Sequence, residues 1–378
     1  MNIAIVGGGP AGLFFALLMK KHDPRHDVRV YEQNSADATY GWGVVFSEVA
    51  LAFLRDADAE FYADFTANHE HCAFMEVVHH GVHVQMHNNA FARASRIDLL
   101  RILQDHCSRA GVSILFNTRI EHPEELASAA LIVAADGVNS TLRTRFADRF
   151  LPTIETGRNM FAWYGTHQLI HPLSLIFRQT EHGVFIAHAY QYSKALSTFL
   201  VEVDPDTWQR AGLDRMSDEQ SRDWCTRVFR PELGANPLLS NRSRWFQASI
   251  VRNLHWSYGN MVLLGDALRT VHFSLGSGTR MAMQDAIALQ RAITAHPGDL
   301  PAAFAHFQQA RGTESAEFQA AAAKSIEWYE TVAARMHLDP VAFACDYMCR
   351  TGRVSIDDLR RRDPRLVEAY EALQQRNA

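Results

Sequence analysis

The chain has 378 residues, of which 47% are hydrophobic and 21% charged, and its formal net charge is −5. This length suits one large α/β unit or two interleaved domains with a sizeable core. The near-neutral charge excludes a basic nucleic-acid binder, and the 10% aromatic content excludes a disordered chain. The five cysteines are scattered and form no C-x-x-C pair, so we expect a reducing, cytoplasmic location rather than a disulfide framework.

The first predicted elements are a buried strand over residues 3–6, a helix over 11–21 and a second strand over 28–32. Together they form a βαβ unit, which requires a parallel sheet. The apolar run that spans this opening has no positively charged start, and glycines interrupt its centre. It is therefore predicted as strand, turn and helix rather than signal peptide or membrane span, and no membrane partner is expected.

Further elements continue the α/β pattern and then change in character. Helices are predicted near 47–55 and over 97–107, a strand-like segment over 74–87, and a buried strand over 131–135. Short strand candidates separated by polar turns follow between about 158 and 203, which indicates an inserted antiparallel sheet. A buried strand over 261–264, a helix over 279–295 and a largely helical tail over 301–375 complete the chain.

The strongest local motif is a G-x-G-x-x-G turn between the first strand and the first helix. Gly7 permits a tight turn, Gly9 lets backbone approach a pyrophosphate, and Gly12 allows close packing of helix on strand. The amide groups at the helix start favour phosphate. Glu32 ends the second strand, twenty residues after Gly12, and is predicted to accept hydrogen bonds from a ribose diol.

Two later segments separate a flavoprotein from a nicotinamide dehydrogenase. Asp136-Gly137-Val138-Asn139-Ser140 with Arg143 follows one buried strand, and Gly265-Asp266 follows another. With the glycine turn, these segments resemble the class A flavoprotein monooxygenases, which are FAD-dependent aromatic hydroxylases. The resemblance implies a Rossmann-like FAD-binding sheet (1–157 and 256–300), an inserted, mainly antiparallel substrate-binding sheet (158–255) and a helical C-terminal region (301–378).

The resemblance also implies the cofactor residues. The expected FAD-binding set is Gly7, Gly9, Pro10, Ala11, Gly12, Glu32, Gly43, Val44, Arg96, Asp136, Gly265, Asp266, Gly276 and Gly278. Among them, Asp136 belongs to a segment linked to both FAD and the nicotinamide cofactor. The family usually has a proline before the last two glycines, where this chain has Ser274. This departure weakens any transfer of the family's loop geometry.

A closer subgroup is indicated by short segments near Trp42, Trp163, His188 and His272. They resemble the monooxygenase part of salicyloyl-CoA and 2-aminobenzoyl-CoA hydroxylases, and most also resemble the indole hydroxylase of the violacein pathway. The tail over 353–364 resembles the aryl-CoA group more. The resemblance therefore implies a small aromatic substrate, either a CoA thioester or an indolic compound.

The activity implied by the resemblance is hydroxylation of an electron-rich ring through a flavin C4a-hydroperoxide, with NADH or NADPH as reductant and O2 as oxidant. A flavin reductase or oxidase, or a flavin-binding protein without turnover, remains an alternative. The substrate-side candidates are His272, Tyr190, His188 and Trp42, each of which has a purely structural alternative. The histidines between 69 and 87 lack metal-ligand spacing, so no metal is expected. The sequence leaves open whether the chain forms a homo-oligomer.

Overall fold

The computed structural model describes residues 1–39, 41–47, 51–67, 69–241 and 243–377. Its first sheet has the strand order β16-β17-β9-β1-β2-β8. The strands are β16 (Ser257–Tyr258), β17 (Met261–Leu263), β9 (Leu131–Ala134), β1 (Asn2–Val6), β2 (Asp27–Tyr31) and β8 (Ser113–Leu115). All neighbours pair in parallel except β16 and β17. This is the sheet that the βαβ pattern predicts.

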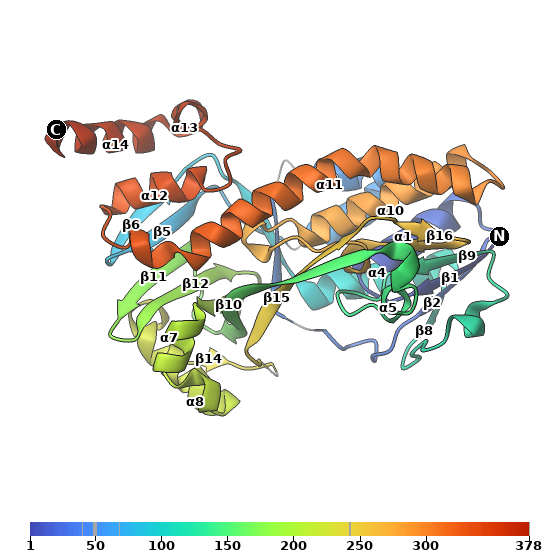
Figure 1. Cartoon of the computed structure of the whole chain (residues 1–378), viewed down its shortest axis with the longest axis horizontal. Coiled ribbons are helices and arrows are strands. Elements are labelled where there is room, and N and C mark those ends of the chain that lie inside the picture. Colours follow the sequence, from blue (N-terminus) through green and yellow to red (C-terminus); the bar gives the residue numbers. More distant parts are fainter. Residues whose placement is uncertain (40, 48–50, 68, 242, 378) are drawn as a thin grey trace.

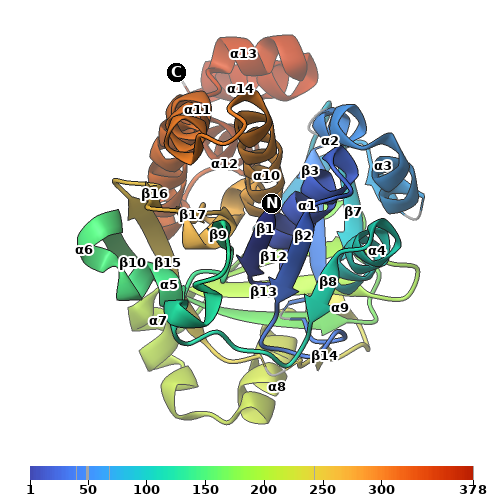
Figure 2. The same cartoon turned by 90° about the vertical axis from the view of Figure 1, so that its right-hand side faces the viewer.

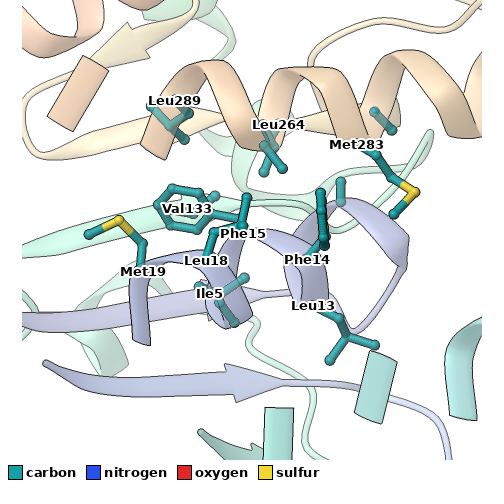
Figure 3. Packing of buried hydrophobic residues seen from close by; sticks show 14 of the residues in the cluster. Ile5, Leu13, Phe14, Phe15, Leu18, Met19, Val133, Leu264, Met283 and Leu289 are labelled. Carbon is teal, nitrogen blue, oxygen red and sulfur yellow. The ribbon is translucent and has the colours of Figure 1, made fainter. Parts of the chain in front are cut away.

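Three helices build the core of this unit: α1 (Pro10–His22), α4 (Arg96–Ala110) and α10 (Gly278–Ala295). Figure 3 shows α1 packed between the sheet and α10, with Phe14 and Phe15 close to Val133, Leu264 and Leu289. Because α1 is apolar on nearly all sides, it is buried within the unit rather than lying on its surface. Two short helices, α5 (Thr141–Arg145) and α6 (Ala147–Phe150), follow β9.

The second sheet is larger and mostly antiparallel, with the order β14-β10-β13-β12-β11-β5-β6 and β15 paired to β10. Its strands are β14 (Leu238–Leu239), β10 (Pro152–Thr166), β13 (Ser197–Val203), β12 (Gly183–Gln191), β11 (Leu173–Thr180), β5 (Met75–His79), β6 (Val82–Met86) and β15 (Phe246–Asn253). The long strands β10 and β15 connect it to the parallel sheet (Figure 1). Helices α7 (Pro205–Arg210), α8 (Asp218–Val228) and α9 (Arg230–Leu233) follow β13.

The large sheet extends beyond the segment 158–255 that the sequence suggested for it. It begins at Pro152, and it includes the hairpin β5–β6 from the preceding segment, with β5 parallel to β11. The hairpin closes through His80 and Gly81, both at positive φ (52° and 75°), which is the geometry of a two-residue turn. Pairing of β5 with β11 joins strands almost 100 residues apart, which local patterns do not reveal.

A small third sheet and the helical tail complete the fold. The third sheet pairs β3 (Gly43–Ser47), β7 (Phe91–Ser95) and β4 (Glu70–Cys72), with α2 (Ala52–Ala57) and α3 (Ala59–Thr66) between them in the chain. The tail consists of α11 (Leu300–Glu330), α12 (Pro340–Cys349), α13 (Ile356–Arg362) and α14 (Pro364–Asn377). In the part of the chain that is described, no helix is both long and apolar enough to cross a bilayer.

Helix α11 links the two large sheets, running beside α10 and then over the large sheet (Figures 1 and 2). A buried ion cluster fixes its first half: Arg269 Nη2 and Arg311 Nε donate to the same Asp285 oxygen, at 2.6 and 2.8 Å. Its second half places Trp328 and Tyr329 in a cluster with residues of β5, β11 and α12. The helix therefore holds the two sheets in a fixed relation around the space between them.

Candidate active site

A cavity of about 620 Å³ lies where the carboxyl end of β1 meets the large sheet. Its lining comes from the turn after β1, from β3, the start of α4, β12, β13 and β15, the segment 266–279, and the tail around α12. Ligands of open parallel sheets bind outside the carboxyl ends of the strands, so this is the position expected for a dinucleotide. The cavity brings together residues from every part of the fold.

The glycine turn has the geometry that a bound pyrophosphate requires. Gly7 has φ +110°, and a Cβ added there would lie 2.2 Å from the Ala135 carbonyl oxygen. A Cβ on Gly12 would lie 2.2 Å from the Gly7 oxygen. At Gly9, by contrast, a Cβ would meet nothing within 4 Å, and the start of α1 faces the cavity there with Pro10 and Ala11. Gly7 and Gly12 thus permit close packing, while Gly9 leaves space beside the helix N-terminus for an anion.

Glu32 lies at the end of β2, where its carboxylate is held by the turn itself. Its Oε2 accepts from the Gly8 N–H at 2.7 Å, and its Oε1 accepts from the backbone N–H and the Nδ2 of Asn34 at 2.8 and 2.7 Å. A carboxylate has about four acceptor positions, so capacity for a ribose hydroxyl remains. Glu32 does not itself line the cavity.

Arg96 and Asp266 both line the cavity, Arg96 from the start of α4 and Asp266 from the segment after β17. Burial raises the pKa of the Asp266 carboxyl above its ordinary value, although Arg96 and Arg269 oppose that shift. Burial lowers the pKa of the Arg96 guanidinium, with Asp266 opposing. Within the described ranges this guanidinium has no hydrogen-bond partner, so its donors are free for a ligand. A phosphate and ribityl chain between these two side chains would satisfy both.

The segment after β9 packs against residues that line the cavity. Asp136 Oδ2 accepts from the N–H groups of Thr141 and Leu142 at 2.8 and 3.3 Å, while its buried Oδ1 has no partner among the residues that the structure describes. Arg143 donates from Nη1 to the Ala267 carbonyl at 3.1 Å and so ties this segment to the one containing Asp266. Asp136 does not line the cavity, but its neighbour Gly137 does, at φ +81°.

The segment 265–278 crosses the glycine turn. Gly265 has φ +60°, and a Cβ there would lie 2.9 Å from that of Ala11. Gly276 and Gly278 line the cavity, and a Cβ on either would meet nothing within 4 Å. Ser274, which replaces the family's proline, hydrogen bonds through Oγ to His272 Nδ1 at 2.8 Å and to Ser325 Oγ at 2.9 Å. Side-chain hydrogen bonds therefore order this loop.

Three of the four predicted substrate-side residues line the cavity. His188 and Tyr190 alternate along β12 and reach the same side, and His272 lies at the start of a short 3₁₀ turn, with its ring centre 5.6 Å from that of Phe161 on β10. The Tyr190 hydroxyl donates to the Gly43 carbonyl at 2.9 Å, which ties β12 to β3. Burial lowers the pKa of His272 to about 4, with Glu202 opposing the shift, so this imidazole is neutral at physiological pH.

Trp42 is the exception, because it does not line the cavity. Its ring lies over Gly165, where an added Cβ would come within 2.7 Å of the indole. Its Nε1 donates to the Trp163 carbonyl at 3.4 Å, and Trp163 is the tryptophan that lines the cavity. Trp42 thus packs against residues of the cavity wall without lining the cavity, and its role toward the substrate stays a prediction.

Two groups of residues around the cavity were not predicted from the sequence. The first is Glu202, which binds the cavity residue His188, together with Asn159, which donates to Glu202; neither of the two lines the cavity itself. A single carboxylate in the fully buried strand β13 was a usable signal, since buried acids need partners. The second group lies on the tail: Tyr347, Met348, Arg350, Thr351, Val354 and Arg362. No local pattern predicts that the tail returns to the site. No group of three metal-type ligands occurs among the residues described.

Comparison with known proteins identifies the family. A family model described as an FAD binding domain matches residues 1–298. The chain belongs to the FAD-dependent aromatic hydroxylases. Salicyloyl-CoA 5-hydroxylase of a Streptomyces species is 38% identical over 95% of this chain and 72% of its own length. Protodeoxyviolaceinate monooxygenase of Chromobacterium violaceum is 35% identical over 93% of this chain and 94% of its own length. A 3-hydroxy-4-methyl-anthranilyl-[aryl-carrier protein] 5-monooxygenase of Streptosporangium sibiricum is 33% identical over 79% and 80%.

Solved structures of this family share the fold at low sequence identity. A tetrameric form of 2-methyl-3-hydroxypyridine-5-carboxylic acid oxygenase superposes with a TM-score of 0.71, 17% identity and coverage of 95% of this chain and 97% of that one. p-Nitrophenol 4-monooxygenase of Pseudomonas putida superposes with a TM-score of 0.73 and 16% identity, and the match covers 97% of both chains. These structures confirm the predicted α/β fold. The family model and the relatives confirm the flavoprotein monooxygenase class and FAD as cofactor.

Proposed function

We propose that this hydroxylase acts on an ortho-amino- or ortho-hydroxybenzoyl group carried as a CoA thioester, and that it hydroxylates the ring para to the activating substituent. Electrons come from NADH or NADPH, and O2 supplies the oxygen atom. FAD, when bound, supplies the chemistry that activates oxygen, and the protein binds the ring, orients it and excludes water. A phenol or aniline suits this reaction because its para carbon is electron-rich.

The proposal rests on one observation: a single cavity extends from the glycine turn to the C-terminal tail. One end begins at the glycine turn, where the ADP part of FAD belongs. The other end reaches α12 and Arg362, which is exposed, so the cavity borders the surface there. Four residues of the C-terminal region, Arg350, Thr351, Val354 and Arg362, line this end, which we call the tail side. We assign the acyl substituent of a ring bound beside His188 to the tail side. The site therefore has room for a handle outside the reacting ring.

The ring end of the cavity suits an aromatic group with a polar substituent. Apolar side chains of Leu175, Leu200 and Phe273 line it beside the two histidines. Apolar walls keep water from the reacting centre, and the neutral His272 ring can hydrogen bond a substituent without adding charge. We therefore assign His188 and His272 to the ring, and Tyr190 to the wall that positions them.

The tail side supports a thioester with a charged carrier. Arg362 forms no ion pair within the described chain, whereas its neighbour Arg361 is paired with Asp358. A free arginine beside a cavity opening favours phosphate, as in the nucleotide part of CoA. Two of the relatives carry names of aryl groups bound to CoA or to a carrier protein, which is the same type of linkage.

A second candidate substrate is an indolic intermediate of a secondary-metabolite pathway. It is favoured by the violacein-pathway relative, which matches this chain over 94% of its own length without any long extension. A flavin reductase or oxidase without ring hydroxylation is the remaining alternative.

The deciding experiment compares substrates side by side. NAD(P)H oxidation is measured with 2-aminobenzoyl-CoA, salicyloyl-CoA, free 2-aminobenzoate, tryptophan and an indolic intermediate, and products are identified by mass spectrometry. We expect hydroxylated product from the CoA esters. Product from the free acid or the indole alone would overturn the thioester while leaving the hydroxylase intact, and NAD(P)H oxidation that yields only peroxide would overturn ring hydroxylation.

A further inference from the structure

We propose that Glu202 is a positioning residue that fixes His188 as a proton acceptor, so that the cavity selects rings bearing an O–H or N–H donor. This inference rests on the proposed function, because it concerns the substituent of the aromatic substrate. Glu202 lies on β13 and is 1% exposed. Neither the family resemblance nor the motifs assign it a role.

Each oxygen of the Glu202 carboxylate has one hydrogen-bond partner. His188 Nε2 lies 2.8 Å from Glu202 Oε2, and Asn159 Nδ2 donates to Oε1 at 2.7 Å. His188 pairs with Leu200 across β12 and β13, so Glu202 is its diagonal neighbour on the same face. The contact is therefore set by strand register, not by a flexible loop.

This geometry determines the tautomer of His188. An ionised carboxylate only accepts hydrogen bonds, so the ring nitrogen facing it must carry the proton. In the neutral imidazole Nδ1 then keeps its lone pair. Across the described residues Nδ1 has no hydrogen-bond partner, on a ring that lines the cavity. The cavity wall thus presents an acceptor, whose complement is a donor on the substrate.

Three other titratable groups surround the His188–Glu202 pair, and none of them supplies a negative charge. Glu202 is therefore the group that balances a positive charge on His188. Tyr329 of α11 packs on the His188 ring at 5.2 Å, and burial raises its pKa well above the ordinary value, so it stays neutral. His272 lies within electrostatic range of the pair, and burial lowers its pKa to about 4, with Glu202 opposing the shift. Arg350 lies farther back, with its guanidinium 3.9 Å from the Tyr347 ring centre.

The chemical step moves one proton and changes no oxidation state. The O–H or N–H bond of the ring substituent breaks, and the proton binds His188 Nδ1, giving an imidazolium whose charge is balanced by Glu202. The electron pair of the broken bond stays on the substituent and raises the electron density at the para carbon, which then attacks the activated oxygen. After hydroxylation the para carbon loses its hydrogen as a proton, which ends in the water formed from the second oxygen atom of O2. The proton held by His188 returns to the substituent, so its transfer consumes no further reactant.

The test replaces Glu202 with its neutral isostere. In Glu202→Gln the amide oxygen can keep accepting from Asn159, and the amide N–H₂ then faces His188 Nε2. This arrangement places the imidazole proton on Nδ1 and turns the acceptor into a donor. The matched control is Glu76→Gln, because Glu76 is a second buried glutamate of the large sheet that binds a histidine, His83, at 3.1 Å but does not line the cavity.

The first measurement is nitrogen-15 NMR of the FAD-loaded protein without substrate. We expect the His188 proton on Nε2 in the wild type and in Glu76→Gln, and on Nδ1 in Glu202→Gln. A wild-type proton on Nδ1 would overturn the inference directly, without any variant and whatever the substrate is.

The second measurement uses salicyloyl-CoA without NAD(P)H, so that no turnover occurs, and follows ionisation of the bound phenol by absorbance. We expect the midpoint to rise by about one pH unit or more in Glu202→Gln, and single-turnover hydroxylation in this variant to approach the wild-type rate as pH rises. Equal midpoints, or a rate loss that is the same at every pH, would overturn the inference. If the wild type binds no aryl thioester, the proposed function fails instead, and NMR alone decides the role of Glu202.

Discussion

The two sides of the cavity are built from different parts of the polypeptide. On the cofactor side the parallel sheet contributes mainly backbone: the open space at Gly9 and the bare surfaces at Gly137, Gly276 and Gly278. On the substrate side the large sheet contributes side chains, with His188 and Tyr190 on β12 and Thr198 on β13. The cofactor side therefore depends on the absence of side chains, and the substrate side on their chemistry.

This difference has an energetic consequence. Backbone that is held by close packing is disturbed by added atoms, so the cofactor side is sensitive to volume. A charge on a buried titratable side chain lowers the free energy of unfolding, so the substrate side is sensitive to pH. The predictions below use this contrast.

The largest effect is expected on the substrate side, from acid. The pKa of His272 falls from 6.5 to about 4 on folding because of burial. The unfolded chain therefore binds a proton below pH 6.5 that the folded chain refuses, and stability is lost as pH falls from 6.5 to 4. We expect the free energy of unfolding of His272→Gln to fall by up to about 3 kcal/mol less than that of the wild type over this pH range. Urea unfolding of both proteins at pH 7.5 and 4.5 measures it, and an equal acid loss in the two would contradict the prediction.

The cofactor side should respond to added volume at one glycine and not at another. Gly12→Ala forces a Cβ to within 2.2 Å of the Gly7 oxygen, and we expect it to lower the free energy of unfolding by about 1–3 kcal/mol even without FAD. Gly9→Ala is the matched control, since its Cβ meets no protein atom within 4 Å and its φ is −78°. It should leave the unfolding of the FAD-free protein unchanged and weaken FAD binding. If both variants behave alike, Gly9 does not border the cofactor.

Glu32 tests the part of the cofactor side that depends on a side chain. We expect Glu32→Ala to weaken FAD by about 1–3 kcal/mol, because the ribose hydroxyl and the Gly8 amide both lose an acceptor. The melting temperature should fall mainly when free FAD is scarce, since ligand stabilises by mass action. Isothermal titration of FAD measures the affinity, with Glu32→Gln expected to lie between the wild type and the alanine variant. An unchanged affinity in the alanine variant would exclude Glu32 from the site.

The smallest effect is expected where the cavity meets the surface. Arg362→Ala should raise KM for a CoA ester by about twofold to fivefold, the size of an exposed ion pair, with little change in kcat. Arg361→Ala serves as control, because Arg361 is paired with Asp358 and does not line the cavity. The difference between the two variants should shrink at high salt. Equal KM values in both would indicate that the carrier phosphates lie elsewhere.

The sequence by itself determined the cofactor side. A G-x-G-x-x-G turn between a strand and a helix needs only short-range geometry, and the turn after β1 has it, with Gly7 at φ +110° and Gly12 against the Gly7 oxygen. The parallel sheet and the inserted antiparallel strands follow from the same local patterns of burial and alternation. Class and cofactor were therefore readable from residue order alone, as the family match confirms.

On the substrate side the sequence predicted His188, Tyr190 and His272, but only the tertiary structure decided what surrounds them. The register of β12 against β13 brings Glu202 behind His188, and the return of the tail after α11 brings Arg350 and Arg362 to the cavity. It also placed Trp42 behind the wall, where Gly165 leaves room for its ring. These contacts join residues tens to hundreds of positions apart, and each depends on how whole elements pack. A sequence pattern records the period of one element, whereas the substrate side is set by the relative positions of several.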